Sequence, residues 1–116
     1  MRFSEVCVLT GGVRKLADFY KRVLEIDNGS DDDSRQVLID GDVRLVFWND
    51  DKLKTNNNTN MSLVFVCDNV DEEYERLNSL KGLRLHFVDR PHDSIDGYRS
   101  LCFYDLDGNM VFFKSN

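Results

Sequence analysis

Two segments of the chain share one pattern, in which an Asp-Gly pair separates two apolar runs. The first segment spans residues 37–47 with its pair at 40–41, and the second spans residues 97–114 with its pair at 107–108. Asp-Gly accepts the positive φ of a tight hairpin turn, and aromatic and β-branched flanking residues suit half-buried strands. We interpret the repeated pattern as an internal duplication.

The periodicity of the remaining residues predicts a strand, a helix and further strands in each half of the chain. Apolar runs predict strands over residues 4–9, 35–39, 42–49, 61–67 and 83–89, followed by the closing hairpin. An apolar stripe at three- and four-residue spacing predicts the first helix. Its members are Val13, Leu16, Ala17, Tyr20, Val23 and Leu24.

The second helix is expected after Asp68 and Asn69, which are residue types that cap helices. Its inward residues are expected to be Val70, Tyr74, Leu77 and Leu80, and Gly82 is placed to end it. Residues 26–34 are mostly acidic and polar, which is typical of a solvated loop, and residues 90–97 read as a mobile loop.

The length of 116 residues predicts a single domain covering residues 1–116. Within it we expect module one at about residues 1–52, a polar linker at about 53–60 and module two at about 61–116. The formal net charge of −6 disfavours binding to nucleic acid or an anionic membrane. No secretory signal or membrane-length apolar stretch is visible, so a cytoplasmic protein is expected. Three scattered cysteines, at positions 7, 67 and 102, are expected to be buried reduced thiols.

Three local motifs resemble the vicinal oxygen chelate superfamily, the group of glyoxalase I, bleomycin-resistance proteins and extradiol dioxygenases. Residues 16–24 (LADFYKRVL) are similar to its first-helix pattern, residues 66–71 (VCDNVD) to the lead of its second helix, and residues 98–113 to its closing hairpin. The resemblance covers essentially the whole chain. It implies an α+β fold of two βαβββ modules that form a curved mixed sheet with a cup-shaped cavity, usually in a homodimer.

Metal-dependent members of this superfamily bind one divalent ion through His and Glu side chains that point into the cup. Carried over to this sequence, those positions fall on Glu5, Ser62, Phe112 and a position near Val46. Only Glu5 could ligate a metal, and a lone carboxylate does not supply the several ligands that a divalent ion requires. We therefore expect no metal and no other cofactor.

Strand alternation extends this assignment to neighbouring side chains, because residues two positions apart share one face of a sheet. Cys7, Leu9, Arg44, Trp48, Val64, Val66 and Met110 are then expected to face the cup. Val6, Val8, Leu63, Phe65, Val111 and Phe113 are expected to pack on the helices. The ligand-binding residues predicted on this basis, with Tyr98 added because it borders the 90–97 loop, are Glu5, Cys7, Arg44, Trp48, Ser62, Val64, Tyr98 and Phe112.

Several of these side chains have alternative roles. Trp48 could be a core or interface residue, Glu5 could form a salt bridge with Arg44, and Tyr98 could be an ordinary strand-end residue. His86 and His92 have no ligand-type neighbours at metal-binding spacing and are expected at the surface or at an edge. No catalytic residues are predicted.

An apolar, aromatic cup with an acid and a base at its edge suits a small apolar, aromatic or cationic ligand. The first hypothesis is thus a metal-independent homodimer that sequesters a small molecule, as the bleomycin-resistance branch does. A divergent glyoxalase- or dioxygenase-like enzyme using Glu5 with His86 is the alternative. A third hypothesis is a dimerisation or interaction module without a ligand.

Overall fold

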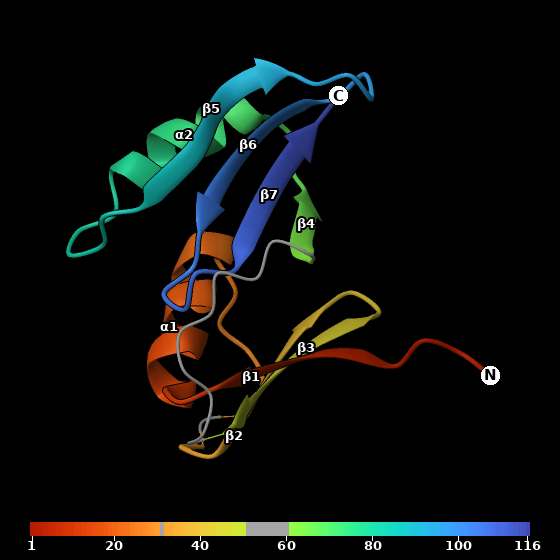
Figure 1. Ribbon diagram of the computed structural model, residues 1–116, viewed down its shortest axis with the longest axis vertical. Coiled ribbons are helices and arrows are strands. Elements are labelled where there is room, and N and C mark those ends of the chain that lie inside the picture. The colour runs from red at the N-terminus through yellow and green to blue at the C-terminus, as the bar shows by residue number, and fades with distance from the viewer. Residues whose placement is uncertain (31, 51–60) are drawn as a thin grey trace. The chain divides into compact units, whose positions relative to one another are not determined.

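The computed structural model describes residues 1–30, 32–50 and 61–116, and for residues 39 and 40 it describes only the backbone. The chain forms two compact units, Met1–Thr55 and Asn56–Asn116, which are described separately here. Each unit runs strand, helix, strands (Figure 1). The predicted linker at residues 53–60 lies outside the described residues.

The first unit contains one helix and a three-stranded mixed sheet. Its elements are β1 (Glu5–Thr10), α1 (Val13–Leu24), β2 (Arg35–Asp40) and β3 (Val43–Asn49). The strand order is β1-β3-β2, with β1 parallel and β2 antiparallel to the central β3. Thr10 Oγ1 accepts a hydrogen bond from the backbone N–H of Gly12 at 3.1 Å, which fixes the turn into α1.

The second unit has the same order of elements with one more strand. Its elements are β4 (Ser62–Val66), α2 (Val70–Asn78), β5 (His86–Asp93), β6 (Arg99–Tyr104) and β7 (Met110–Ser115). The strand order is β4-β7-β6-β5, with β4 parallel to β7 and the other pairs antiparallel. Figure 1 shows α2 lying along the β5 and β6 side of the sheet.

The two mixed sheets with their helices confirm the predicted α+β fold. The first unit, however, shows one strand fewer among its described residues than the βαβββ order implies. Residues 27–33 are too polar to supply a buried strand, and the Asp32 carboxylate instead accepts hydrogen bonds from the backbone and side chain of Ser34, each at 2.7 Å. These bonds lower the pKa of Asp32 below its ordinary value.

Strand β5 lies later in the chain than the sequence predicts. It spans His86–Asp93 rather than residues 83–89, so much of the predicted loop at 90–97 is strand, and a tight turn closed by Ser94 and Tyr98 follows. The sequence pattern does not predict the full strand, because its pairing with β6 has two irregularities and because it contains Pro91. An edge strand tolerates both, because its outer N–H groups have no ladder partner to lose.

The face of each sheet that packs on its helix carries most of the core, and Val37, Val46 and Cys102 on the opposite faces are also buried. In the first unit the Tyr20 and Phe47 rings lie 5.2 Å apart and are fully buried. In the second unit ring contacts run across the whole sheet to the helix. They join Phe65 to Phe113 (6.1 Å), Phe113 to Phe103 (5.4 Å), Phe103 to Phe87 (6.0 Å) and Phe87 to Tyr74 (4.9 Å). Neither described helix has the length and apolar character of a membrane span.

Strand register shows that the two units repeat one another closely. Glu5 precedes the start of α1 by the same number of residues as Ser62 precedes the start of α2. The parallel pairs that correspond are Glu5–Arg44 and Ser62–Met110, Cys7–Val46 and Val64–Phe112, and Leu9–Trp48 and Val66–Lys114. The internal duplication inferred from the Asp-Gly hairpins is therefore present in the pairing of the strands.

Candidate functional site

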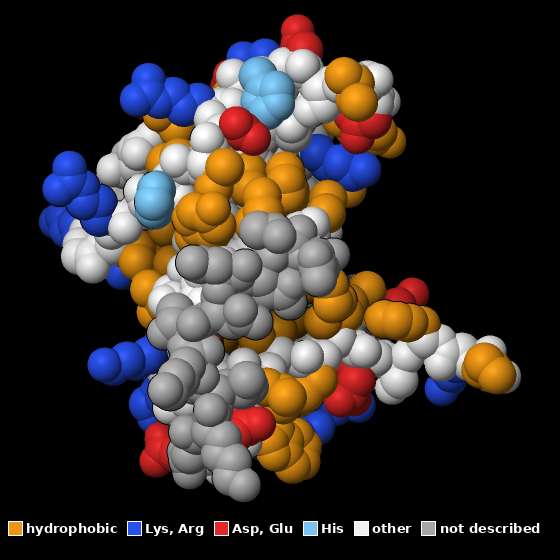
Figure 2. Space-filling model, in the orientation of Figure 1, with side chains coloured by type: hydrophobic (Ala, Val, Ile, Leu, Met, Phe, Trp, Pro, Cys, Tyr) orange, Lys and Arg blue, Asp and Glu red, His pale blue; other side chains and the backbone are white. Residues whose placement is uncertain are grey.

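Each sheet has a second face, opposite its helix, which we call the helix-free face. In the first unit it carries Glu5, Cys7, Leu9, Arg35, Val37, Arg44, Val46 and Trp48. In the second unit it carries Ser62, Val64, Val66, His86, Asp89, His92, Ser100, Cys102, Tyr104, Met110, Phe112 and Lys114. Strand alternation assigns these residues, because the residues between them pack on the helix. Figure 2 shows hydrophobic side chains gathered over β6 and β7 in the second unit and others along the strands of the first.

All four site residues predicted in the first unit lie on its helix-free face. Glu5 and Arg44 are direct register partners at one end of the β1–β3 pair, and Cys7 lies between that end and Trp48. Within the described part of the chain Glu5 and Arg44 form no ion pair, so the predicted salt bridge is absent. Trp48 is 48% exposed and its register partner Leu9 is 50% exposed. Trp48 is therefore not a core residue of its own unit.

Arg35 completes this end of the face, and sequence reasoning missed it. It lies opposite Trp48 in the antiparallel β2–β3 pair, and its guanidinium carbon is 5.3 Å from the centre of the indole ring. A guanidinium over an indole face is a favourable cation–π arrangement. Only the register of β2 against β3 reveals this pair, since thirteen sequence positions separate the two residues.

Three of the four site residues predicted in the second unit lie within its sheet, on the helix-free face. Ser62 pairs with Met110, and Val64 pairs with Phe112. Val64 is 52% exposed, and Phe112 is half-buried in the central strand β7. Val66, farther along β4, is 73% exposed. The β4 edge of this face is thus apolar and accessible.

Tyr98, the fourth residue, lies immediately before β6 and contacts Lys114. Lys114 is a second residue of the face that sequence reasoning missed. The Lys114 ammonium lies 4.2 Å from the centre of the Tyr98 ring. The Tyr98 backbone is held by a hydrogen bond from its N–H to Asp96 Oδ1 at 3.1 Å. Tyr98 therefore has a cation over its ring and a fixed backbone at the start of β6.

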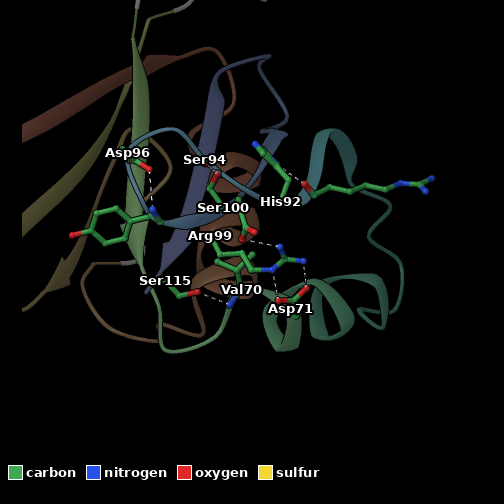
Figure 3. A network of polar contacts seen from close by, with 11 residues as sticks. Val70, Asp71, His92, Ser94, Asp96, Arg99, Ser100 and Ser115 are labelled. Atoms are coloured by element: carbon green, nitrogen blue, oxygen red, sulfur yellow. Dashed lines mark hydrogen bonds and ion pairs between the residues drawn. The ribbon is translucent and has the colours of Figure 1, made fainter.

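A polar network on the other side of β6 fixes the backbone next to Tyr98 (Figure 3). Arg99 donates to both carboxylate oxygens of Asp71 in α2, at 2.7 and 3.0 Å, and to Asp93 in β5 at 3.1 Å. The bonds from Arg99 hold the pKa of Asp71 below its ordinary value, and the two carboxylates raise the pKa of Arg99. On the helix-free side, the Ser94 and Ser100 hydroxyls are hydrogen-bonded to each other.

The β5 edge of the second face carries imidazole and carboxylate groups. His86 lies opposite Tyr104 with ring centres 5.3 Å apart, and His92 Nδ1 lies 2.8 Å from the carbonyl oxygen of Arg90. Both histidines are exposed on an edge strand. Asp89 lies opposite the buried Cys102, and burial together with this carboxylate raises the pKa of the Cys102 thiol to about 11.

The three cysteines differ in exposure, which partly corrects the sequence-based expectation. Cys102 is buried, Cys67 is half-buried with its pKa raised mainly by burial, and Cys7 is exposed. Cys7 is exposed because it lies on the helix-free side of the edge strand β1, whereas an apolar run in the sequence does not distinguish the two faces.

The superfamily's metal positions do not form a suitable ligand set in this chain. Glu5 is the only one of them with a carboxylate, while Val46, Ser62 and Phe112 offer a methyl group, a hydroxyl and a phenyl ring. Val46 is also fully buried. Among the described residues no group of three His, Cys, Asp or Glu side chains is arranged to hold a metal ion. The donor chemistry therefore does not fit a divalent ion at these positions.

Two repeated units with strand, helix and mixed sheet define a duplicated α+β protein. The chain belongs to the Glyoxalase/Bleomycin resistance protein/Dioxygenase superfamily, whose family model matches residues 2–113, and this confirms the resemblance seen in the sequence. No curated protein matches the sequence significantly.

Solved structures similar to this chain share its fold at low sequence identity. A protein of unknown function from Agrobacterium tumefaciens has a TM-score of 0.83 at 17% identity, covering 100% of this chain and 94% of that one. The bleomycin resistance determinant encoded on transposon Tn5 has a TM-score of 0.71 at 20% identity, covering 100% and 98%. The fosfomycin resistance protein FosX from Mesorhizobium loti has a TM-score of 0.75 at 17% identity, covering 99% and 92%.

Proposed function

We propose that this chain is a metal-independent small-molecule-binding protein that sequesters its ligand and acts as a homodimer. The observation that carries the proposal is the composition of the helix-free faces. At the superfamily's metal positions this chain has one carboxylate, one hydroxyl and two apolar side chains, and most of their neighbours on the same faces are apolar or aromatic. Four of these, Leu9, Trp48, Val64 and Val66, are between 48% and 73% exposed.

Exposed apolar side chains on one face of a sheet favour a binding role over a purely structural one. Burial of apolar surface contributes about 25 cal/mol of stabilising free energy for each Å² removed from water, and surface left exposed does not gain this stabilisation. Apolar patches of this kind mark ligand- or partner-binding surfaces. Small-molecule sites combine such walls with a few polar anchors, which Glu5, Arg44 and Ser62 supply here.

The description of the superfamily names two kinds of enzyme, glyoxalases and dioxygenases, together with bleomycin resistance proteins. The Tn5 bleomycin resistance determinant has a fold like that of this chain, and so does FosX. At 20% and 17% identity these similarities concern the fold, so the choice between functions rests on the side chains of the site.

The first test uses chelation. Protein treated with EDTA and protein supplemented with Mn²⁺, Zn²⁺ or Ni²⁺ are screened against aromatic fragments by the emission of Trp48, the only tryptophan. We expect the same set of fragments to change the emission in both samples, and the same thermal unfolding midpoint. A response or a stabilisation that requires the metal would contradict the proposal.

The Glu5→Gln variant separates the proposal from the enzyme alternative. If Glu5 were a ligand in a relocated metal site, the variant would lose both a bound ion, measured by metal analysis, and the metal-dependent response. We expect no ion to be lost and only a small change in fragment affinity. Absence of any fragment response would favour the interaction-module alternative.

The homodimer is tested by light scattering coupled to size-exclusion chromatography. We expect twice the chain mass of 13.5 kDa at micromolar concentration. A monomer mass for the unmodified chain would contradict the dimer.

A further inference from the structure

The same combination of side chains occurs at corresponding places in the two units. Trp48 in β3 and Lys114 in β7 hold equivalent positions, since each is the register partner of the third residue on the helix-free side of its parallel neighbour. Each belongs to a pair in which a cation lies over an aromatic ring. In the first unit Arg35 lies over Trp48, and in the second Lys114 lies over Tyr98.

An exposed apolar side chain lies beside each pair. Leu9 is the parallel neighbour of Trp48, and Val66 is the parallel neighbour of Lys114. They are 50% and 73% exposed. Each unit therefore offers a ring, a cation held over that ring and an accessible apolar surface at one end of its helix-free face.

Neither cation is paired with a carboxylate of the described residues, among which no ion pair involves Arg35 or Lys114. Arg99, by contrast, forms ion pairs with two carboxylates on the helix-packed side of β6. The chain has 21 acidic and 15 basic residues, so acidic side chains outnumber basic ones. Two basic side chains that have no acidic partner among the described residues are therefore unexpected.

The charges that share each face lie away from these pairs. In the first unit Glu5 is at the opposite end of β1 from Leu9 and has Arg44 as its register partner. In the second unit the aspartate of the helix-free face, Asp89, is on the edge strand β5, which is not adjacent to the strand of Lys114. Among the described residues of the helix-free faces, each ring thus has a cation and no carboxylate beside it. Two nearby carboxylates, those of Asp32 and Asp96, accept hydrogen bonds from the backbone N–H groups of Arg35 and Tyr98.

We propose that these two pairs are recognition sites for a planar aromatic molecule bearing a carboxylate. The ligand ring packs against Leu9 or Val66 and the edge of the indole or phenol, while its carboxylate accepts hydrogen bonds from Arg35 or Lys114. The protein ring holds the cation in place before the ligand arrives, which reduces the loss of side-chain freedom on binding. Charge-assisted hydrogen bonds then select the anion. This inference rests on the proposed small-molecule-binding function and specifies its ligand class.

The test compares three probes of one shape and different charge, namely 1-naphthoate, 1-naphthamide and 1-naphthylmethylammonium. Each is titrated into the whole protein in EDTA, and binding is followed by NMR on the indole N–H signal of Trp48 and the amide signal of Lys114. We expect the carboxylate to bind roughly tenfold more tightly than the amide, and the ammonium to bind most weakly.

Variants assign the preference to the cations. Arg35→Gln and Lys114→Met remove each charge, and the matched controls Arg84→Gln and Lys15→Met remove a charge from exposed positions outside the helix-free faces. Unchanged amide signals elsewhere show that each variant is folded. We expect Arg35→Gln to abolish the preference for naphthoate at the Trp48 signal only, and Lys114→Met to abolish it at the amide signal of residue 114 only. Both controls should keep the preference at both signals.

The outcomes separate this inference from the function on which it rests. If the amide or the ammonium binds as tightly as naphthoate, or if each cation variant keeps the preference at its own signal, the anionic ligand class is wrong and small-molecule binding stands. If none of the three probes binds, this ligand class is also wrong, and small-molecule binding is overturned only if the fragment screen gives no response either.

Discussion

Gln36 in β2 has a buried side-chain amide. It is fully buried on the helix-packed face, opposite Phe47, and among the described residues neither Oε1 nor Nε2 has a hydrogen-bond partner. An unsatisfied buried amide costs about 1–3 kcal/mol. We therefore expect Gln36→Met, which keeps the shape and removes the polar atoms, to raise the free energy of unfolding in urea by about 1–2 kcal/mol.

The charged variant provides the control for Gln36. Gln36→Glu keeps the size of the side chain and should lower stability, because it buries a carboxylate among apolar neighbours. Destabilisation by Gln36→Met would instead show that the amide is hydrogen-bonded in solution.

Gly29 approaches a neighbouring strand more closely than any side chain would permit. Its φ is 87°, and a Cβ atom built on it would collide with the carbonyl oxygen of Val37. Gly41 has a φ of 60° in the first hairpin turn, with nothing within 4 Å of an added Cβ. We expect Gly41→Ala to cost about 1–2 kcal/mol for its backbone conformation, and Gly29→Ala to cost about 2 kcal/mol more because of the collision. Equal losses in urea unfolding would contradict the close approach.

The candidate site could be predicted only in part from single residues. Alternation correctly placed Trp48, Val64 and Phe112 on the side of the sheet away from the helices, because the period of a strand is two. Arg35 and Lys114 were missed, since their contacts with aromatic rings depend on which strand pairs with which and in what register. That information is absent from the local sequence.

At the scale of elements, the two helices begin differently. Asn69 caps α2, and its Oδ1 accepts a hydrogen bond from the backbone N–H of Glu72 at 3.1 Å. Gly12 occupies the same place before α1 and offers no side-chain cap. We expect Asn69→Ala to lower the free energy of unfolding by about 1 kcal/mol.

A second substitution at the same position controls for the loss of the amide. Asn69→Ser retains a cap oxygen and should cost much less than Asn69→Ala in the same urea titration. Equal losses for the two variants would show that the cap bond does not stabilise α2.

The first helix and the strands before β5 were predicted to within a residue, whereas the second helix and β5 were not. Helix α2 ends at Asn78, before the expected inward residue Leu80 and the expected end at Gly82. The apolar stripe of the first helix predicts α1 where the structure has it, Val13–Leu24, since a 3.6-residue period over three turns is distinctive. The sequence placed β5 three to four residues too early in the chain, because two irregularities in its pairing with β6 break the alternation that marks a strand. An edge strand with a proline reads as a loop in sequence.

At the scale of the whole molecule, each unit contains a carboxylate whose pKa is lowered in the folded state. Hydrogen bonds from Ser34 lower the pKa of Asp32 in the first unit, and those from Arg99 lower the pKa of Asp71 in the second. A depressed folded-state pKa contributes stability that is complete above the unfolded-state value near 3.8 and is lost as the pH falls through the lower folded-state value. Stability should therefore decline below about pH 4.

The Asp71→Asn variant tests the second of these contributions. We expect it to reduce stability at pH 6 and to weaken the decline between pH 5 and 2.5, measured as urea midpoints. Asp68→Asn, at an exposed neighbouring position, is the matched control and should leave the profile unchanged. An unaltered profile for Asp71→Asn would contradict the role assigned to the Arg99 pair.

The duplication gives the whole molecule two helix-free faces of similar construction. Superfamily membership accounts for the arrangement of strands. The proposed binding rests on the exposed apolar residues and on two cations that form no ion pair among the described residues. The central claim is that ligands bind on these faces without metal.

Methyl-selective NMR in EDTA tests that claim most directly. With 1-naphthoate at saturation, we expect shifts of the methyl signals of Leu9, Val64 and Val66, which lie on the helix-free faces. The buried methyl signals of Leu16 and Leu77 on the helices should stay unchanged. Shifts confined to the helix side, or shifts that occur only after a divalent metal is added, would contradict it.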